Sequence, residues 1–164
     1  MKRPDPQSGF SIMDIIMGLS IIAVAIVGMM LAQRNYVQQS SQVEVGLRAV
    51  SLGNSVMNII RMHAYDDSTS SPWSPSLGPN TGESSADDYD DIDDYDGASW
   101  DFSNDGFAGF TINTRVFNVQ IPTNWVDSVG TGGNFKKITV TVNHSVLKSP
   151  VTFSSIVAGI EEHD

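Results

Sequence analysis

A dense run of aspartates in the middle of the chain has the residue types best suited to chemistry. Residues 82–97 read GESSADDYDDIDDYDG. Crowded carboxylates suit a hard cation such as Ca²⁺, which takes about six to eight oxygen ligands. The candidate calcium ligands are Asp90, Asp91, Asp93, Asp94 and Asp96.

The run does not match an EF-hand calcium loop. With Gly97 at the sixth loop position, Ile92 falls at the first and Ser103 at the twelfth, where acidic residues are needed. The alternative to a calcium site is a solvated acidic loop, its charges partly satisfied by helix N-termini and backbone donors. Tyr89 and Tyr95 flank Ile92 at intervals of three residues, which predicts a loop pinned to the domain rather than a free acidic tail.

No other pattern points to catalysis or to a resident cofactor. The sequence lacks a Gly-x-Ser-x-Gly elbow, a phosphate loop and a His-Glu-x-x-His motif. The histidines, His63, His144 and His163, are too scattered for a zinc site, and the absence of cysteine excludes disulfides and thiolate ligands. The net charge of −10 argues against a nucleic-acid partner. We therefore expect a protein that is not an enzyme.

The elements that position these residues begin with an apolar N-terminal segment. Residues 12–32 read IMDIIMGLSIIAVAIVGMMLA, with Asp14 as the one charged residue. The segment is long enough to cross a bilayer as a helix. Lys2 and Arg3 precede it, which predicts a cytoplasmic N-terminus and an extracytoplasmic location for the acidic bulk of the chain.

The junction at Ser8, Gly9 and Phe10 lies before the apolar segment rather than after it. In an ordinary secretory signal the apolar region spans about 7–15 residues and the cleavage site follows it. Cleavage after Gly9 would instead remove the basic leader and leave the whole hydrophobic helix on the mature protein.

The motif GFSIMD at residues 9–14, followed by an apolar helix, resembles the prepilin signature of type IV pilins and secretion-system pseudopilins. The resemblance implies that a prepilin peptidase cuts after Gly9 and methylates Phe10. The family has glutamate at the fifth mature position, where this chain has Asp14, one methylene shorter. Asp14 is then expected to neutralise the free amino group of Phe10 on a neighbouring subunit, because a carboxylate in hydrocarbon usually marks function. The alternative is a plain signal anchor with Asp14 near the cytoplasmic interface.

The rest of the sequence predicts an α+β fold, in which one long helix packs on a small antiparallel sheet. The helix is expected from about Phe10 to about Met62. Its expected apolar stripe comprises Val43, Leu47, Val50, Val56, Met57, Ile59 and Ile60. Alternating residues over 110–121, 135–142 and 151–157 predict three or four strands, with a phase slip near Arg115 interpreted as a bulge.

The predicted segments divide the chain into five parts. They are a leader (1–9), a transmembrane and assembly helix (10–32), its amphipathic continuation (33–64), an acidic loop region (65–106) and a sheet (107–164).

Residues 82–97, together with 137–142 and 151–155, resemble the minor pilins of the D type in the mannose-sensitive haemagglutinin pilus. The resemblance implies a minor pilin whose precursor crosses the inner membrane once and then enters a pilus at the cell surface. Its partners would be other pilin subunits, contacted through the N-terminal helix, and the prepilin peptidase. Two alternatives are a pseudopilin of a type II-like secretion system and a single-span anchored calcium-binding or adhesive domain.

Overall fold

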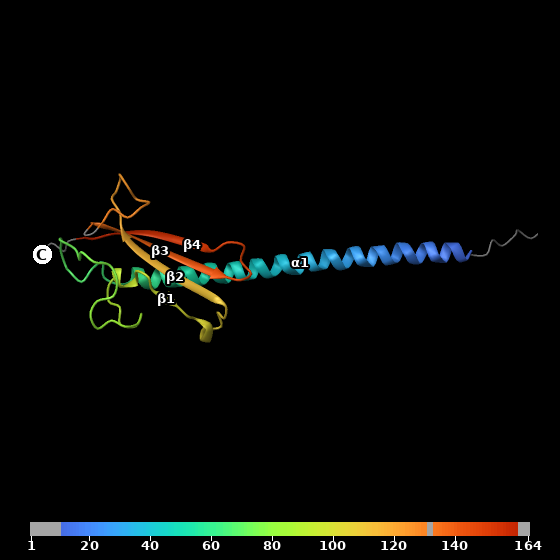
Figure 1. Cartoon of the computed structure of the whole chain (residues 1–164), viewed down its shortest axis with the longest axis horizontal. Coiled ribbons are helices and arrows are strands. Elements are labelled where there is room, and N and C mark those ends of the chain that lie inside the picture. The colour runs from blue at the N-terminus through green and yellow to red at the C-terminus, as the bar shows by residue number, and fades with distance from the viewer. Residues whose placement is uncertain (1–10, 131–132, 161–164) are drawn as a thin grey trace, which may run out of the picture. The chain divides into compact units, whose positions relative to one another are not determined.

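The computed structural model describes residues 11–130 and 133–160, so Gly9 and Phe10 lie outside the described residues. Figure 1 shows one long helix followed by a four-stranded sheet. The elements are α1 (Ile12–Arg61), the short 3₁₀ helices η1 (Asp93–Tyr95) and η2 (Ser103–Asp105), and the strands β1 (Ser99–Trp100), β2 (Phe110–Asn118), β3 (Phe135–His144) and β4 (Val151–Ala158). The contacts divide the chain into two units, Met1–Ser41 and Gln42–Asp164, which are described separately.

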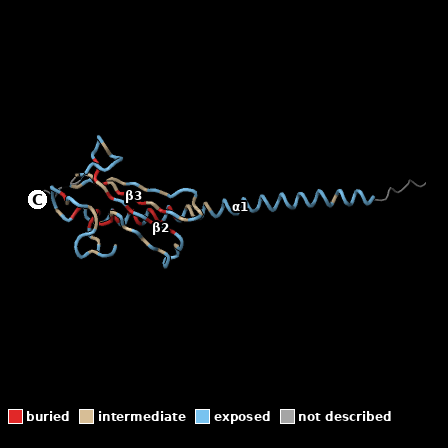
Figure 2. The backbone as a smooth tube through the Cα atoms, viewed as in Figure 1, coloured by how far each residue is buried: buried red, intermediate tan, exposed pale blue. Residues whose placement is uncertain are grey.

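In the first unit, the described residues from Ile12 onward belong to α1, and their apolar side chains are exposed. Ile12 is 76% exposed, and the pale colour of Figure 2 continues along this stretch. The helix is long and apolar enough to cross a membrane, as the sequence predicts. The Ser20 hydroxyl donates to the carbonyl oxygen of Ile16 at 2.8 Å, which satisfies a polar group within the apolar surface.

In the second unit, the last part of α1 covers one face of the sheet and forms the core with it. The buried helix residues recur at intervals of three and four: Ala49, Leu52, Gly53, Val56, Met57 and Ile60. Together with inward residues of β2 and β3, these residues form the buried core. Figure 2 colours the buried stretches of the backbone red. The expected α+β arrangement of a long helix on an antiparallel sheet is therefore confirmed.

The buried face of the helix differs in part from the predicted stripe. Val56, Met57 and Ile60 are buried as expected, but Val43, Leu47, Val50 and Ile59 are exposed. Compared with the predicted stripe, the buried face of the helix is rotated so that it includes Ala49 and Gly53. A Cβ atom on Gly53 would lie only 2.2 Å from Cε2 of Phe153 on β4. Because Gly53 has no Cβ atom, the helix and the sheet can approach closely here. The spacing of apolar residues alone does not reveal this contact.

The sheet has the order β1-β2-β3-β4, and neighbouring strands are antiparallel. The bulge expected near Arg115 is wrong, because β2 and β3 pair without interruption from Phe110 opposite His144 to Asn118 opposite Lys136. The apparent phase slip arises because Phe117 is apolar at a position of the other face, whereas Asn118 is polar at an inward position. Thr114 is a second polar residue at an inward position. Its hydroxyl lies 2.6 Å from the carbonyl oxygen of Tyr95, which makes the buried position tolerable.

Candidate functional site

The acidic run lies beside the segment that leaves α1. Ala64 pairs with Asp91 in an isolated parallel bridge, and the amide of Ile92 donates to the carbonyl oxygen of Ala64 at 3.0 Å. Ile92 and Tyr95 are buried in the core, so the run is pinned to the domain as the spacing of its apolar residues predicts. The region expected as loop also contains η1, β1 and η2.

A buried lysine next to the run organises part of its charge. Lys136 on β3 is 1% exposed, and its Nζ lies 2.9 Å from Oδ2 of Asp66 and 2.6 Å from Oδ1 of Asp93. The same ammonium donates to the carbonyl oxygen of Tyr65 at 2.6 Å and lies 4.4 Å from the centre of the Tyr65 ring. One cation therefore ties the segment after α1, the acidic run and β3 together.

Two of the predicted calcium ligands have other roles. Asp93 is engaged with Lys136, and Asp96 accepts a hydrogen bond from the amide of Val116 at 2.9 Å. Asp96 thus satisfies a backbone donor of β2 instead of joining a carboxylate cluster.

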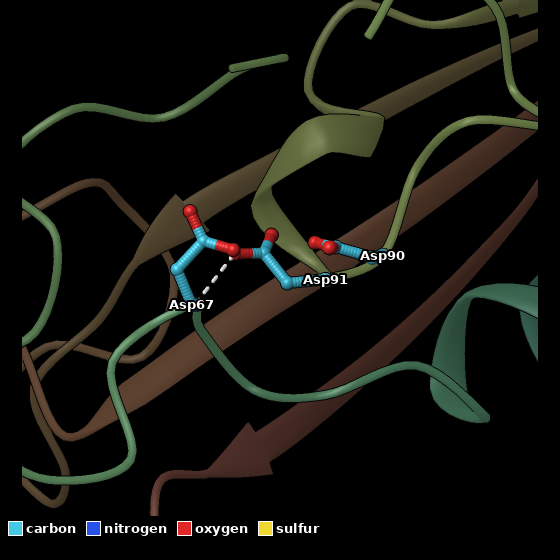
Figure 3. Close-up of side chains that lie close together, drawn as sticks. All are labelled: Asp67, Asp90 and Asp91. Carbon is cyan, nitrogen blue, oxygen red and sulfur yellow. Dashed lines mark hydrogen bonds between the residues drawn. The ribbon is translucent and has the colours of Figure 1, made fainter. Parts of the chain in front are cut away.

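The other three, Asp90, Asp91 and Asp94, come together with two residues that sequence reasoning missed. Single carboxylate oxygens of Asp67, Asp90 and Asp91 lie within 4.8 Å of one another, and the same holds for Glu83, Asp90 and Asp94. Figure 3 shows the carboxylates of the first group turned toward one another. We call Asp67, Glu83, Asp90, Asp91 and Asp94 the acidic cluster.

Asp67 and Glu83 gave only a weak signal in the sequence. Asp67 follows the helix at a distance from the run, and Glu83 is separated from it by small residues. Their approach depends on folding of the intervening segment. Asn80 links Asp67 and Glu83. Its backbone amide donates to Oε2 of Glu83 at 2.7 Å, and its side-chain amide donates to Oδ2 of Asp67.

Burial and nearby negative charges raise the pKa of Asp67, Glu83 and Asp91. The pKa of Asp91 is raised to about 7. Burial is the largest cause, and the negative charges of Asp93 and Asp94 add to it. Burial and the charges of Asp91 and Asp90 also raise the pKa of Asp67. The backbone hydrogen bond from Asn80 lowers the pKa of Glu83, but burial and Asp94 outweigh it, so that this pKa is raised as well.

Asp66 behaves in the opposite way. Burial opposes its ionisation, but the hydrogen bond from Lys136 and those from Ser68 and Ser74 hold the pKa of Asp66 below its ordinary value. Lys136 therefore stabilises the negative charge of Asp66. Within the described residues, its ion pairs reach Asp66 and Asp93 and do not reach the acidic cluster.

The predicted assembly residue belongs to the first unit. Asp14 lies in the first turn of α1, and its Oδ2 accepts a hydrogen bond from the amide of Ser11 at 3.2 Å. This position suits an acidic residue, because free amides and the positive end of the helix dipole meet there.

Comparisons of the chain with protein-family models, with curated proteins and with solved structures find no match.

Proposed function

We propose that this chain is a structural subunit, of the minor pilin type, of a type IV pilus-like filament. In this proposal it is processed after Gly9 and assembles through its N-terminal helix. The observation that supports it most strongly is the apolar surface of α1 before residue 32, which is exposed around the helix and has Asp14 as its one charge. Such a surface needs a cover of lipid or of other helices, because water solvates it poorly.

A filament explains how the same apolar helix surface can be covered first by lipid and later by neighbouring helices. The precursor rests in the inner membrane, with the Gln42–Asp164 unit outside the cytoplasm. In the filament, neighbouring helices replace lipid, so assembly depends on close packing more than on a further hydrophobic gain. Gly18 and Gly28 leave small gaps in the helix surface, where no atom lies within 4 Å of an added Cβ. A head-to-tail contact that does not close extends such an array into a filament.

In the proposed filament, Asp14 fixes the axial offset between neighbouring subunits. Cleavage after Gly9 creates a positively charged amino group on Phe10, and the Asp14 carboxylate of a neighbouring subunit neutralises it. Pairing offsets the cost of a charge in hydrocarbon, whereas a subunit shifted along the filament leaves both charges unpaired. The acidic motif and the β3–β4 hairpin favour the minor pilin type through their resemblance to that family.

The test of this proposal is the N-terminus of the mature protein. Intact mass measurement and N-terminal sequencing of protein from its native membrane or filament fraction should find a chain that begins at methylated Phe10. A chain that still begins at Met1 or Lys2, in cells with a working prepilin peptidase, would contradict the proposal and favour a membrane-anchored acidic domain.

A further inference from the structure

The acidic cluster has the geometry of a site for a single cation. The oxygens of Glu83, Asp90 and Asp94 lie within 4.8 Å of one another. Calcium binds oxygen at about 2.3–2.6 Å, so two ligands on one ion lie at most about 5 Å apart. The three oxygens are therefore close enough together to contact one ion. Asp90 also belongs to the neighbouring group with Asp67 and Asp91, which brings further negative charge to the same place.

A buried oxygen of Asp94 provides a second, independent observation. Asp94 is 1% exposed, and its Oδ2 accepts hydrogen bonds from the amides of Asp90 and Asp91, both at 3.1 Å. Its Oδ1 is buried and has no hydrogen-bond partner. A buried carboxylate oxygen without a partner is unfavourable, and most such atoms in proteins are satisfied. A cation bound by Glu83, Asp90 and Asp94 would supply a positive charge next to this incompletely satisfied carboxylate.

The backbone around the cluster holds its carboxylates in place. Oδ1 of Asp91 accepts from the amide of Asp93 at 2.8 Å, and Oδ2 of Asp91 accepts from the amide of Asp67 at 2.9 Å. Lys136 compensates Asp66 and Asp93 and leaves the acidic cluster without an ion-pair partner among the described residues. The carboxylates are thus fixed close together although they repel one another.

We propose that Glu83, Asp90 and Asp94 bind one calcium ion, with Asp67 and Asp91 increasing the negative charge of the site. The ligand set contains oxygen alone, with no histidine or cysteine, which disfavours zinc and other transition metals. Its ligands come from separate parts of a loop, which suits the adaptable coordination of calcium better than the strict octahedron of magnesium. The ion ties the turn at Glu83 to η1. This site is independent of filament assembly.

The experiment is calcium titration of the full-length chain in detergent micelles after removal of metal with EDTA. Isothermal titration calorimetry with CaCl₂ should show one ion bound per chain, and the melting temperature should rise with calcium concentration, because the ion binds the folded state. Parallel titration with MgCl₂ should show weaker binding. Absence of calcium binding up to about 10 mM, above the weakest range of extracellular modules, would overturn the proposal, and tighter binding of magnesium would overturn the assignment to calcium.

Matched variants locate the site. Glu83→Gln and Asp94→Asn should each weaken calcium binding by at least about tenfold, because each removes a charged ligand. Asp87→Asn removes an exposed carboxylate of the same run outside both groups and should leave the affinity unchanged. Asp67→Asn should have a smaller effect than Glu83→Gln.

Two results would contradict the placement. One is an equal loss of calcium affinity in Asp87→Asn and Glu83→Gln, which would indicate that net charge rather than a specific ligand determines binding. The other is loss of binding in Asp67→Asn with normal binding in Glu83→Gln, which would place the ion elsewhere. Circular dichroism of each variant without calcium separates a lost ligand from a lost fold, and Glu83→Gln is the mildest change because Glu83 is half-buried.

Discussion

At the scale of single residues, Lys136 has the largest consequence for stability. Its ammonium is buried between Asp66 and Asp93, and its removal would leave two buried carboxylates without their cation. We expect Lys136→Met to lower the free energy of unfolding by about 3–5 kcal/mol, as found when one partner of a buried ion pair is removed. Urea unfolding followed by circular dichroism measures this loss.

Lys137 on the same strand is the matched control. It is half-exposed and lies 5.7 Å from the centre of the Phe117 ring. We expect Lys137→Met to change the free energy of unfolding by less than about 1 kcal/mol. Equal stability of the two variants would contradict the prediction, because it would mean that the buried ion pairs of Lys136 contribute little to stability.

The raised pKa of Asp91 predicts how stability depends on pH. A carboxyl whose pKa is about 7 in the folded state holds a proton that it loses in the unfolded state at much lower pH. The folded protein therefore binds more protons than the unfolded chain between about pH 4 and pH 7, and stability falls as pH rises through this window. Asp67 and Glu83, whose pKa values are also raised, act in the same direction.

Denaturant unfolding without calcium at several pH values between 5 and 8 should therefore show a decrease in stability with increasing pH. Asp91→Asn removes the titrating group and should flatten this dependence. Its single amide oxygen can replace only one of the two carboxylate oxygens that accept backbone hydrogen bonds, so the variant should also be less stable at every pH. A stability that rises with pH in the same window would contradict the prediction. Asp66 does not interfere, because its lowered pKa affects stability only at more acidic pH.

At the scale of elements, Gly53 decides how closely α1 approaches the sheet. An added Cβ would collide with the Phe153 ring. We expect Gly53→Ala to destabilise the protein by about 1–3 kcal/mol, although alanine is the better helix former. Thermal and urea unfolding of the variant measure the change.

Gly46 provides the control on the same helix. No atom lies within 4 Å of a Cβ added at Gly46. Gly46→Ala should therefore stabilise the protein by up to about 1 kcal/mol, through helix propensity alone. Stabilisation by both substitutions would mean that Phe153 moves aside easily and that close packing at Gly53 is unimportant.

The elements also show what the sequence can and cannot predict. Alternation along β3 predicted that strand, because apolar and polar residues keep one period over 137–142. β4 was predicted as well, although Ser155 and Ile156 break its alternation. In β2 the hydrophobicity pattern suggested a false bulge, because Phe117 is apolar on the other face while Thr114 and Asn118 are polar at inward positions. Thr114 is held there by a hydrogen bond that no hydrophobicity pattern contains. Lys136 could have been found, since it shares the parity of Ile138, Val140 and Val142 and must face the core with them.

At the scale of the whole molecule, Asp14 connects the chain with its proposed assembly. Asp14→Ala should insert into the membrane and be processed, yet remain in the membrane fraction, because a neighbouring amino group loses its partner. Asp14→Glu restores the length found in the family and should enter filaments. Immunoblots of sheared filaments and of membranes from the same cells measure the distribution. Normal incorporation of Asp14→Ala would contradict the role of this residue.

The overall plan of the molecule was predictable because it depends on long, repeated patterns. An apolar helix followed by alternating strands indicates an α+β fold before any contact is known. The acidic cluster was predictable only in part. Asp90, Asp91 and Asp94 are close in sequence, whereas Asp67 and Glu83 join them through the turn at Asn80. Asp93 and Asp96 look equivalent to them in sequence, but the core engages both elsewhere.

The partners of Lys136 impose an order of events on a growing or translocating chain. Lys136 follows Asp93 by 43 positions and Asp66 by 70. A chain delivered N-terminus first therefore presents its aspartates well before the cation that neutralises two of them. Until β3 has been delivered, Asp66 and Asp93 lack the ammonium that neutralises them in the folded unit. The buried ion pairs of the segment after α1 and of the acidic run can therefore form only after the residues of β3 are present.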